Sequence, residues 1–349
     1  MRPVGITSNW ISGSNQDGEF KFYPMDKKKT DPVRTVGYIL EAVLVIALGA
    51  VFSQLPKSMA GHFGFFAGAL LFRLDKRDRK WAYHNLDIMF KDRPLLQFEK
   101  DRIVRALFIN IAKLAFEYLQ LGKLKAKTLP EFLQAENHQA VDEALGEKKG
   151  VLVITAHFGN WEYLGVLGSQ LGYHVATVLK RQHNPYTDRW LTKIREEKGG
   201  VKCFYHGRGL NHRIGVHLKQ NGILALLADQ RYISSSLIAP FFGVSSITAA
   251  GPAKLHLWYE SPIVFAFSIK QPDGRFLLQF DGPYHFAGSG DHRRDCVNIM
   301  TFINKKYEAV IRKYPEQWLS LLTPRWQGVI SKNVALTKDG ESGNTATDF

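Results

Sequence analysis

Short apolar runs alternate with amphipathic stretches from residue 151 to residue 313. The apolar runs have the length and the β-branched and aromatic content of buried strands, whereas the stretches between them repeat apolar residues at helical spacing. The sequence predicts strands at residues 151–155, 174–179, 201–205, 222–228, 263–269 and 275–280. It predicts helices at residues 161–171, 186–198 and 295–313. This alternation is typical of an α/β fold, in which helices flank a mostly parallel central sheet.

An apolar run near the N-terminus, residues 35–56, is interrupted only by Glu41 and Gln54. Its length is close to the roughly 20 residues that cross a bilayer. The run starts too late for an ordinary signal peptide and has no obvious cleavage site, so it is expected to be retained. A carboxylate inside a membrane is costly, and Glu41 therefore leaves three possibilities: a span, a helix lying in the membrane, or a buried soluble helix. We interpret the run as an N-terminal membrane-anchoring helix.

A second apolar run, residues 59–72, is shorter and contains His62, which suits an interfacial or core helix. Residues 101–124 repeat apolar side chains every three or four positions, as an amphipathic helix does.

The chain is therefore expected to have four parts. Residues 1–34 form a polar extension that we expect to be disordered, and residues 35–72 form the membrane-anchoring helices. Residues 73–330 form the α/β domain, and the polar tail, residues 331–349, is again expected to be disordered.

The formal net charge of +14 indicates anionic partners. Lys27, Lys28, Lys29 and Arg34 precede the first apolar run, and a basic segment, residues 73–80, follows the second. Basic charges on both sides of the apolar runs fit a chain held at the cytoplasmic face of a membrane. No nucleic-acid partner is expected, because no recognisable nucleic-acid-binding motif accompanies the charge.

The segment TAHFGNWE, residues 155–162, follows the first predicted strand and contains the best candidate for a catalytic group. Ligands of open α/β sheets bind at the carboxyl ends of the strands. His157 is suited to act there as a general base, because imidazole titrates near neutrality. Glu162 converges on His157 only if the chain turns between them. We expect it to orient the imidazole ring and to stabilise its protonated form.

Two residues inside this segment support that interpretation. Gly159 permits close backbone approach. Asn160 is expected to cap the following helix, whose N-terminus would then face developing negative charge. As a bare motif the His/Glu spacing is weak, and a histidine packed in the core is the alternative.

The chain contains no GxSxG nucleophile elbow, and its two cysteines, Cys203 and Cys296, lie far apart without metal-ligand spacing. The sequence therefore predicts neither a metal nor a cofactor. It favours direct attack by an acceptor hydroxyl on an acyl donor over a covalent acyl-enzyme. A hydrolase in which His157 activates water is disfavoured by the same observations. A non-enzymatic binding protein would leave the turn around His157 unexplained.

Three further blocks follow. The first, residues 179–200, contains Arg181, Asn184 and Arg195; the second begins with Asp229 and Gln230 and continues to Pro240-Phe241-Phe242-Gly243; the third, residues 314–326, reads YPEQWLSLLTPRW. The aromatic side chains of Trp161, Phe241 and Phe242 either line a slot for an acyl chain or pack in the core.

The blocks AHFGNWE, KRQHNP, DQ…PFFG…T…GPA and PEQW, in this order, resemble the late acyltransferases of lipid A biosynthesis, of the lauroyl- and myristoyl-transferase type. The segment RKWAYHNLDIMF matches the same family before the core. The resemblance implies an inner-membrane enzyme that moves a fatty acyl chain from acyl carrier protein to a Kdo-bearing lipid A precursor. It implies that His157 and Glu162 are the catalytic pair. The candidate substrate-binding residues are Asn160, Arg181, Asn184, Arg195, Asp229, Gln230, Phe241 and Phe242.

The donor is expected to be a thioester on the acidic carrier protein, because the chain has no Walker-type loop with which to activate a carboxylate using ATP. The basic surface also suits an acidic partner. The acceptor stays open, since Thr323-Pro324-Arg325-Trp326 stands where the family often has His-Arg-Arg-Trp. The N-terminal extension is also longer than usual. The alternative is an acyltransferase of the same superfamily acting on another glycolipid, an aminolipid or glycerol phosphate.

Overall fold

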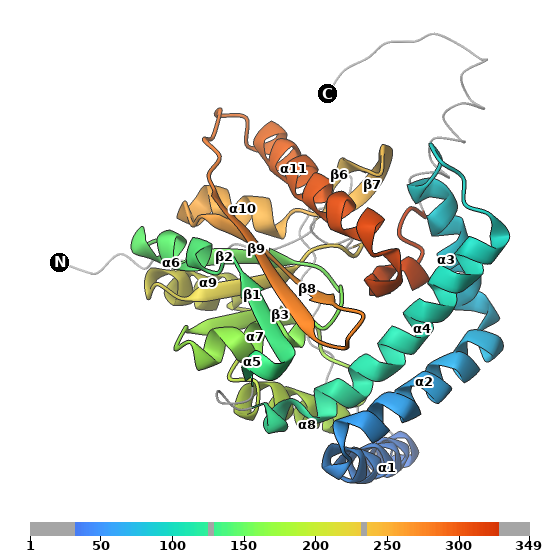
Figure 1. Cartoon of the computed structure of the whole chain (residues 1–349). Coiled ribbons are helices and arrows are strands. Elements are labelled where there is room, and N and C mark those ends of the chain that lie inside the picture. The colour runs from blue at the N-terminus through green and yellow to red at the C-terminus, as the bar shows by residue number, and fades with distance from the viewer. Residues whose placement is uncertain (1–31, 125–128, 232–235, 328–349) are drawn as a thin grey trace.

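A seven-stranded sheet forms the centre of the computed structural model, which describes residues 32–124, 129–231 and 236–327 (Figure 1). The strands are β1 (Leu133–Glu136), β2 (Val151–Thr155), β3 (Val175–Leu179), β4 (Lys202–Tyr205), β5 (Ile223–Leu227), β8 (Ile263–Lys270) and β9 (Phe276–Tyr284). Their order across the sheet is β1-β9-β8-β2-β5-β3-β4, and every neighbouring pair is parallel except β8 with β9. The predicted α/β fold with a mostly parallel sheet is confirmed.

Strand β2 lies in the middle of the sheet, and all five of its residues are buried. An unbroken apolar run such as VLVIT is what a central parallel strand requires, because helices cover both of its faces. Successive side chains point to opposite faces. Val151 and Val153 pack with Val141 on one face, whereas Leu152 and Ile154 belong to the larger core on the other.

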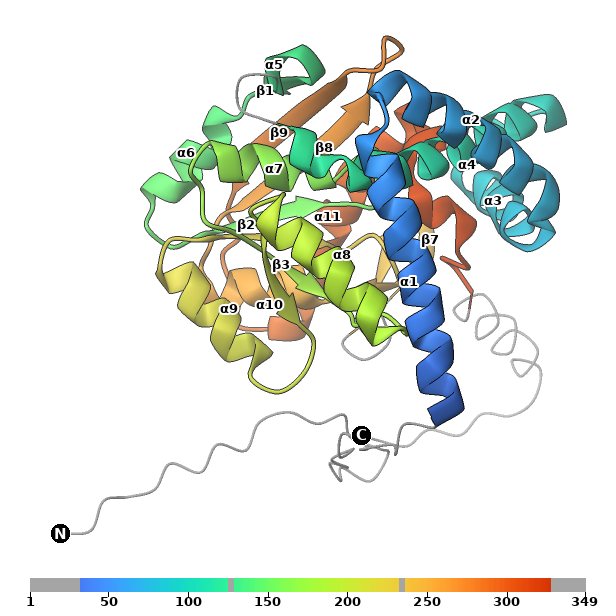
Figure 2. The ribbon, with the colours of Figure 1, turned by 90° about the horizontal axis from the view of Figure 1, so that it is seen from below.

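Helices cover both faces of the sheet (Figures 1 and 2). One face carries α6 (Gln139–Gly146), α7 (Glu162–Gln170) and α8 (Pro185–Glu197), and the other carries α9 (Leu210–Lys219), α10 (Gly251–Tyr259) and α11 (His292–Lys313). A two-stranded hairpin, β6 (Ser236–Phe241) with β7 (Val244–Ala249), packs against α11. The short elements are η1 (Leu121–Lys123), α5 (Leu129–Phe132), η2 (Pro315–Gln317) and η3 (Leu319–Leu322).

Four N-terminal helices lie along one side of this α/β body (Figure 1). They are α1 (Pro32–Gln54), α2 (Lys57–Leu74), α3 (Lys76–Met89) and α4 (Gln97–Leu119). Helix α2 packs so closely along α4 that a Cβ atom added at Gly68 would lie 2.4 Å from the Cα atom of Ile109. Helix α1 contacts both α4 and α8. Within the described residues, it is the one helix long and apolar enough to cross a membrane, so an apolar N-terminal helix that can serve as an anchor is confirmed.

The predicted polar ends, residues 1–34 and 331–349, lie outside the described part of the chain, except that α1 already begins at Pro32. Strand β1, helices α3, α6, α9 and α10 and the hairpin were not predicted. Only one of the four residues of β1 is buried, so its apolar signal is weak. In the hairpin, Phe242 and Gly243 form the connection with φ of +52° and +70°. The sequence PFFG does not predict this turn, because phenylalanine rarely adopts a positive φ.

Candidate active site

His157 lies on the loop that joins β2 to α7. The backbone of this loop is tied to the segment after α11: the N–H of Leu319 donates to the carbonyl of His157 (2.8 Å), and the N–H of Gly159 donates to that of Gln317 (2.9 Å). Gly159 has φ of +55°, and a Cβ atom there would lie 1.7 Å from the carbonyl oxygen of Ser268. Only glycine fits this position, which confirms the close backbone approach expected from the sequence.

The imidazole ring of His157 is held by Asp229. Asp229 follows β5, the strand that pairs with β2 in the sheet. The distance from Nδ1 of His157 to Oδ1 of Asp229 is 2.8 Å, and the backbone N–H of His157 donates to the same oxygen at 3.1 Å. The second oxygen, Oδ2, accepts hydrogen bonds from Nε1 of Trp318 (2.9 Å) and from Oγ of Ser320 (2.6 Å). The carboxylate is fully buried and has partners on both oxygens.

The electrostatics of this pair determine which ring nitrogen is available. Burial by itself would raise the pKa of Asp229, but the adjacent His157 and the hydrogen bonds from His157, Ser320 and Trp318 hold that pKa below its ordinary value. An ionised carboxylate only accepts hydrogen bonds, so Nδ1 of His157 must carry a proton. The lone pair of the neutral ring is then on Nε2, as a general base requires.

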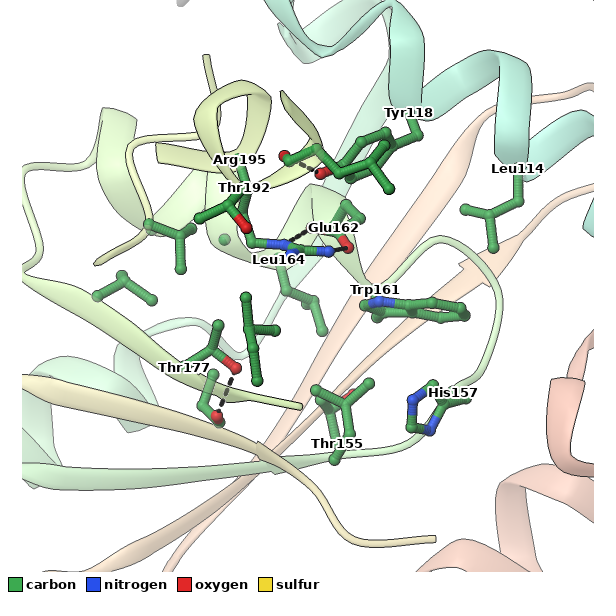
Figure 3. Close-up of a pocket in the computed structure, with 18 of the residues that line it drawn as sticks. Leu114, Tyr118, Thr155, His157, Trp161, Glu162, Leu164, Thr177, Thr192 and Arg195 are labelled. Carbon is green, nitrogen blue, oxygen red and sulfur yellow. Dashed lines mark hydrogen bonds and ion pairs between the residues drawn. The ribbon is translucent and has the colours of Figure 1, made fainter. Parts of the chain in front are cut away.

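Glu162 does not orient His157 as the sequence suggested. Its carboxylate instead forms a two-point ion pair with Arg195 on α8, from Nε to Oε2 (2.9 Å) and from Nη2 to Oε1 (2.5 Å) (Figure 3). Within the described residues, no hydrogen bond joins Glu162 to His157. Glu162 is the first residue of α7, and its side chain points toward Arg195 on α8. The position beside Nδ1 of His157 is occupied by Asp229 instead.

The ion pair between Glu162 and Arg195 is largely removed from water, with side-chain exposures of 8% and 18%. Burial would lower the pKa of Arg195, but the hydrogen bonds and charge of Glu162 raise it, so the guanidinium stays charged. The Cζ atom of Arg195 lies 5.4 Å from the centroid of the Tyr118 ring. The pair therefore connects α7 to α8, and Tyr118 extends the contact to α4.

A cavity of about 960 Å³ extends from His157 between the sheet and helices α7 and α8 (Figure 3). The strands contribute Val153, Thr155, Val175, Thr177, Ile223 and Ala225 to its wall. Helix α7 contributes Leu164 and Leu167, and Leu171 follows at its C-terminal cap; helices α1 and α4 contribute Leu48, Phe52, Ile111 and Leu114. Most of the wall is apolar, and the polar groups near His157 are few. The cavity has the character of a site for a long hydrocarbon chain with a reactive group at one place.

One polar group in this wall has a free hydrogen-bonding capacity. Thr155 is the last residue of β2 and lies beside His157 in the cavity (Figure 3). Its side chain is buried, and its hydroxyl has no hydrogen-bond partner among the described residues. Buried hydroxyls without a partner are uncommon in folded proteins.

The cavity wall includes two of the other sequence-predicted site residues, Arg195 and Gln230. Among the described residues that line the cavity, Asn160, Arg181, Asn184, Phe241 and Phe242 are absent. Asp229 does not line the cavity either, and its carboxylate is hydrogen-bonded to His157.

Both asparagines have structural partners. Asn184 caps α8 by accepting hydrogen bonds from the N–H groups of Tyr186 and Thr187, and its amide donates to the carbonyl of Tyr38 on α1 (2.9 Å). Asn160 does not cap α7 as expected. The N-cap position of α7 is Trp161, one residue later. The side-chain amide of Asn160 donates to Oε2 of Glu117 on α4 (2.9 Å).

The two phenylalanines belong to the core. Phe241 stacks on Trp326, with ring centroids 5.5 Å apart and an interplanar angle of 19°, and Phe242 contacts the same indole edge-on. Arg181 is exposed and places its guanidinium 4.3 Å from the centroid of the Tyr205 ring. Of the two interpretations for the phenylalanines, core packing is therefore the one that the structure supports.

Sequence reasoning missed the residues that complete the site. Trp318 and Ser320 lie in the block PEQWLS, which was noted without a role, and Thr155 was assigned only to a strand. Polar groups at the end of a buried strand, such as Asp229 and Thr155, were the available signal. The partners of Asp229, which are Trp318 and Ser320, lie 89 and 91 positions away in the chain, a separation that no local pattern reveals.

Comparisons with known proteins agree with this geometry. The model of the bacterial lipid A biosynthesis acyltransferase family matches residues 26–328. The chain is also 25% identical over 239 residues to the phosphatidylinositol mannoside acyltransferase of Mycolicibacterium smegmatis, an alignment that covers 65% of this chain and 73% of that protein. The family match spans the four N-terminal helices, the residues that line the cavity and the loop that carries His157. The chain is an acyltransferase, and it belongs to the bacterial lipid A biosynthesis acyltransferase family.

Proposed function

We propose that this protein is a membrane-bound O-acyltransferase that transfers a fatty acyl chain from the thioester of acyl carrier protein to a hydroxyl of a Kdo-bearing lipid A precursor. The observation that carries the proposal is the placement of His157, whose ring is held by the buried Asp229 at the wall of a long apolar cavity. Family membership supports the reaction class.

In the proposed reaction, Nε2 of His157 removes the proton from the acceptor hydroxyl as its oxygen attacks the thioester carbon. The carbon–oxygen bond forms and the carbon–sulfur bond breaks. The departing thiolate then takes the proton from the imidazolium, so no covalent intermediate with the protein is needed. Asp229 keeps Nδ1 protonated throughout and stabilises the imidazolium while it exists. A positioned base of this kind contributes about 10²- to 10⁴-fold to the rate.

Thr155 is the proposed hydrogen-bond donor to the reacting substrate. The side chain of Thr155 lines the cavity next to His157, and its buried hydroxyl has no partner among the described residues. A rotation of the side chain that turns this hydroxyl toward the substrate would supply a donor, shielded from water, for charge that develops on the thioester oxygen. A hydrogen bond from Thr155 to the substrate would also remove the free-energy cost of a buried hydroxyl that has no partner.

The ion pair between Glu162 and Arg195 is proposed to act indirectly. It joins α7, which follows the catalytic loop, to α8, which forms the opposite wall of the cavity. The pair thereby keeps the cavity at a fixed width next to His157. Its loss is expected to disturb substrate placement and stability together.

An excess of exposed positive charge supports the carrier-protein donor. Between residues 180 and 219, nine cationic side chains are exposed: Lys180, Arg181, Arg189, Lys193, Lys198, Lys202, Arg208, Arg213 and Lys219. Two exposed acidic residues, Glu196 and Glu197, lie in the same stretch. Lys180 also lines the cavity, which brings one of these charges to the site itself. Such a charge excess favours encounter with an acidic protein, and salt weakens that attraction.

A different glycolipid acceptor is the second candidate, because the relative from Mycolicibacterium smegmatis is a phosphatidylinositol mannoside acyltransferase. Both acceptors are anionic lipids that carry sugar hydroxyls. The base and the cavity described above are suited to either, and the choice depends on surfaces outside the catalytic pair.

The test supplies the purified full-length protein in lipid vesicles with three donors and two acceptors. The donors are acyl carrier protein thioester, acyl-coenzyme A, and free fatty acid with ATP; the acceptors are a Kdo-bearing lipid A precursor and a phosphatidylinositol mannoside. We expect the carrier-protein thioester with the lipid A precursor to react fastest, and its rate to fall as salt is raised. Faster transfer from free acid with ATP would contradict the donor, and faster transfer to the mannoside would select the second candidate.

A further inference from the structure

Helix α1 is attached to the α/β body close to both of its ends. Near the beginning, the carbonyl of Tyr38 accepts a hydrogen bond from the side chain of Asn184 (2.9 Å). Near the end, the side-chain amide of Gln120 donates to the carbonyls of Phe52 (3.3 Å) and Leu55 (2.9 Å). A rise of 1.5 Å per residue puts about 21 Å of helix between Tyr38 and Phe52. Most of the length of α1 is therefore fixed to the protein.

The contacts between these two points are close. The ring of Trp190 on α8 lies against Gly49, where an added Cβ would come 2.4 Å from the ring. Ala42, near the middle of the helix, is 3% exposed. The ring of Phe52 packs edge-on against Phe116 of α4, at 4.8 Å between centroids. One side of α1 is thus occupied by α8 and α4.

The other side of α1 is apolar and uncovered. Its exposed side chains recur at helical spacing, and they are Val36, Leu40, Val43, Leu44, Leu48 and Val51, with exposures between 48% and 65%. Helix α2 adds Phe63, Phe66, Leu70 and Leu74, which are 46–68% exposed. In Figure 1, α1 is seen end-on while α2 runs across the view, and both form the lower right border of the molecule. The two helix axes therefore lie in one face.

A membrane-crossing orientation of α1 conflicts with this arrangement. Helix α8 would enter the hydrocarbon beside α1, together with its exposed Arg189 and Lys193. Glu41, which is exposed in the first half of α1, would also lie inside the bilayer. Charged groups in hydrocarbon are costly. An orientation in the plane of the membrane leaves all three groups at or above the headgroup level, while the apolar side chains of α1 and α2 enter the acyl region.

We propose that α1 lies in the plane of the membrane interface and does not cross the bilayer. The face formed by α1 and α2 is the surface that inserts into one leaflet. Exposed cations at the ends of the two helices, Arg34, Arg73, Lys76 and Arg77, are positioned to meet anionic headgroups. The cavity wall includes Leu48 and Phe52 of α1 and Leu114 of α4, so the catalytic cavity reaches the inserted face. A lipid substrate would then enter sideways from the leaflet. The orientation of α1 does not depend on the identity of the donor or acceptor.

The test measures the depth of three positions along the uncovered side of α1. In a full-length protein with Cys203→Ser and Cys296→Ala, single cysteines replace Val36, Leu44 or Val51 and carry a bimane fluorophore. The protein is reconstituted in vesicles of phosphatidylethanolamine and phosphatidylglycerol that contain lipids with a nitroxide quencher at a shallow or a deep acyl position. A fluorophore at Val216, an exposed apolar residue on α9, is the control.

An in-plane helix predicts the same shallow depth at all three positions, and no quenching at Val216. A spanning helix predicts a deep Leu44 between two shallow ends, and this result would overturn the proposal. Absence of quenching at all three positions would also overturn it, because the face would then be covered by protein rather than by lipid. Acyl transfer is not measured in this experiment, so its outcome is separate from that of the proposed reaction.

Discussion

Nδ1 of His157 lies 2.8 Å from Oδ1 of Asp229, a residue 72 positions later in the chain. Each residue follows a strand, and β2 and β5 are parallel neighbours whose carboxyl ends meet at the same edge of the sheet. The topology thus brings a base and its buried carboxylate together without any local sequence motif. His157 and Glu162, which the sequence suggested as a pair, have different partners in the structure: His157 contacts Asp229, and Glu162 contacts Arg195.

Replacement of His157 by alanine should lower acyl transfer by about 10²- to 10⁴-fold, because the general base is lost. The side chain is 23% exposed and is not part of the main core, so folding should be retained. Turnover with a saturating donor, together with the melting temperature, checks this. A folded variant that transfers at nearly the wild-type rate would exclude His157 as the base.

Removing the charge of Glu162 should lower stability and disturb substrate placement, while leaving the chemical step largely intact. Glu162→Gln leaves Arg195 without its anionic partner, which costs about 3–5 kcal/mol for a fully buried pair and less here because Arg195 is 18% exposed. The double variant Glu162→Gln with Arg195→Met should be more stable than the sum of the single effects, because neither charge remains alone. Urea unfolding in detergent measures the coupling, and strict additivity would argue against the ion pair.

Thr155→Val keeps the shape of the side chain and removes only the hydroxyl. The hydroxyl has no partner among the described residues, so the free energy of unfolding should not fall. If the hydroxyl binds substrate, kcat/KM should decrease by about 10-fold, which corresponds to a hydrogen bond of about 1.4 kcal/mol. Thr177→Val is the matched control, since the hydroxyl of Thr177 already donates to the carbonyl of Ala225 at 3.0 Å. Equal effects on transfer from both variants would exclude a special role for Thr155.

Phe241→Ala should destabilise the protein by about 3–5 kcal/mol, the usual cost of removing a fully buried phenylalanine. The side chain is 0% exposed and packs against Trp318 and Trp326. Because it lies in the core and not in the cavity wall, the preference among acyl-chain lengths should stay the same. Thermal unfolding and competition between donors of two chain lengths measure these effects. A changed chain-length preference at unchanged stability would return Phe241 to the substrate site.

The stability that Asp229 contributes should depend on pH. Its pKa in the folded protein is held below the ordinary value of 3.8, so folding favours the ionised form. The contribution is complete above the unfolded-state pKa and is lost as the pH falls toward the lower folded-state pKa. The difference in unfolding free energy between wild type and Asp229→Asn should therefore be constant above about pH 5 and shrink below about pH 4. If the difference in unfolding free energy grew on acidification, burial would outweigh the hydrogen bonds, and the pKa of Asp229 in the folded protein would be raised.

Much of the architecture could be predicted from the sequence because apolar periodicity reports burial directly. Strand β2 and helix α11 were found almost to the residue, since one is buried on both faces and the other repeats buried residues every three or four positions. Strand β1 and the hairpin were missed because most of their residues face solvent or alternate weakly.

The site was predicted less completely. Periodicity located His157 and Asp229 at strand ends, but the partner of each side chain depends on strand order, which no short segment encodes. Asn184 was assigned to substrate from the family resemblance and Phe241 as part of an apolar slot, although Asn184 caps a helix and holds α1 and Phe241 fills the core. Long-range contacts of this kind require the folded chain.

The most direct test of the catalytic account compares Asp229→Asn with Glu162→Gln in single-turnover acyl transfer, at saturating donor and acceptor. If Asp229 holds the ring of His157, Asp229→Asn should lower the rate of the chemical step by about 10²- to 10⁴-fold, as loss of a correctly oriented base does. Folded Glu162→Gln protein should keep a rate much closer to wild type, because its partner is Arg195. A near-normal rate for folded Asp229→Asn, together with loss of transfer in folded Glu162→Gln, would contradict the account.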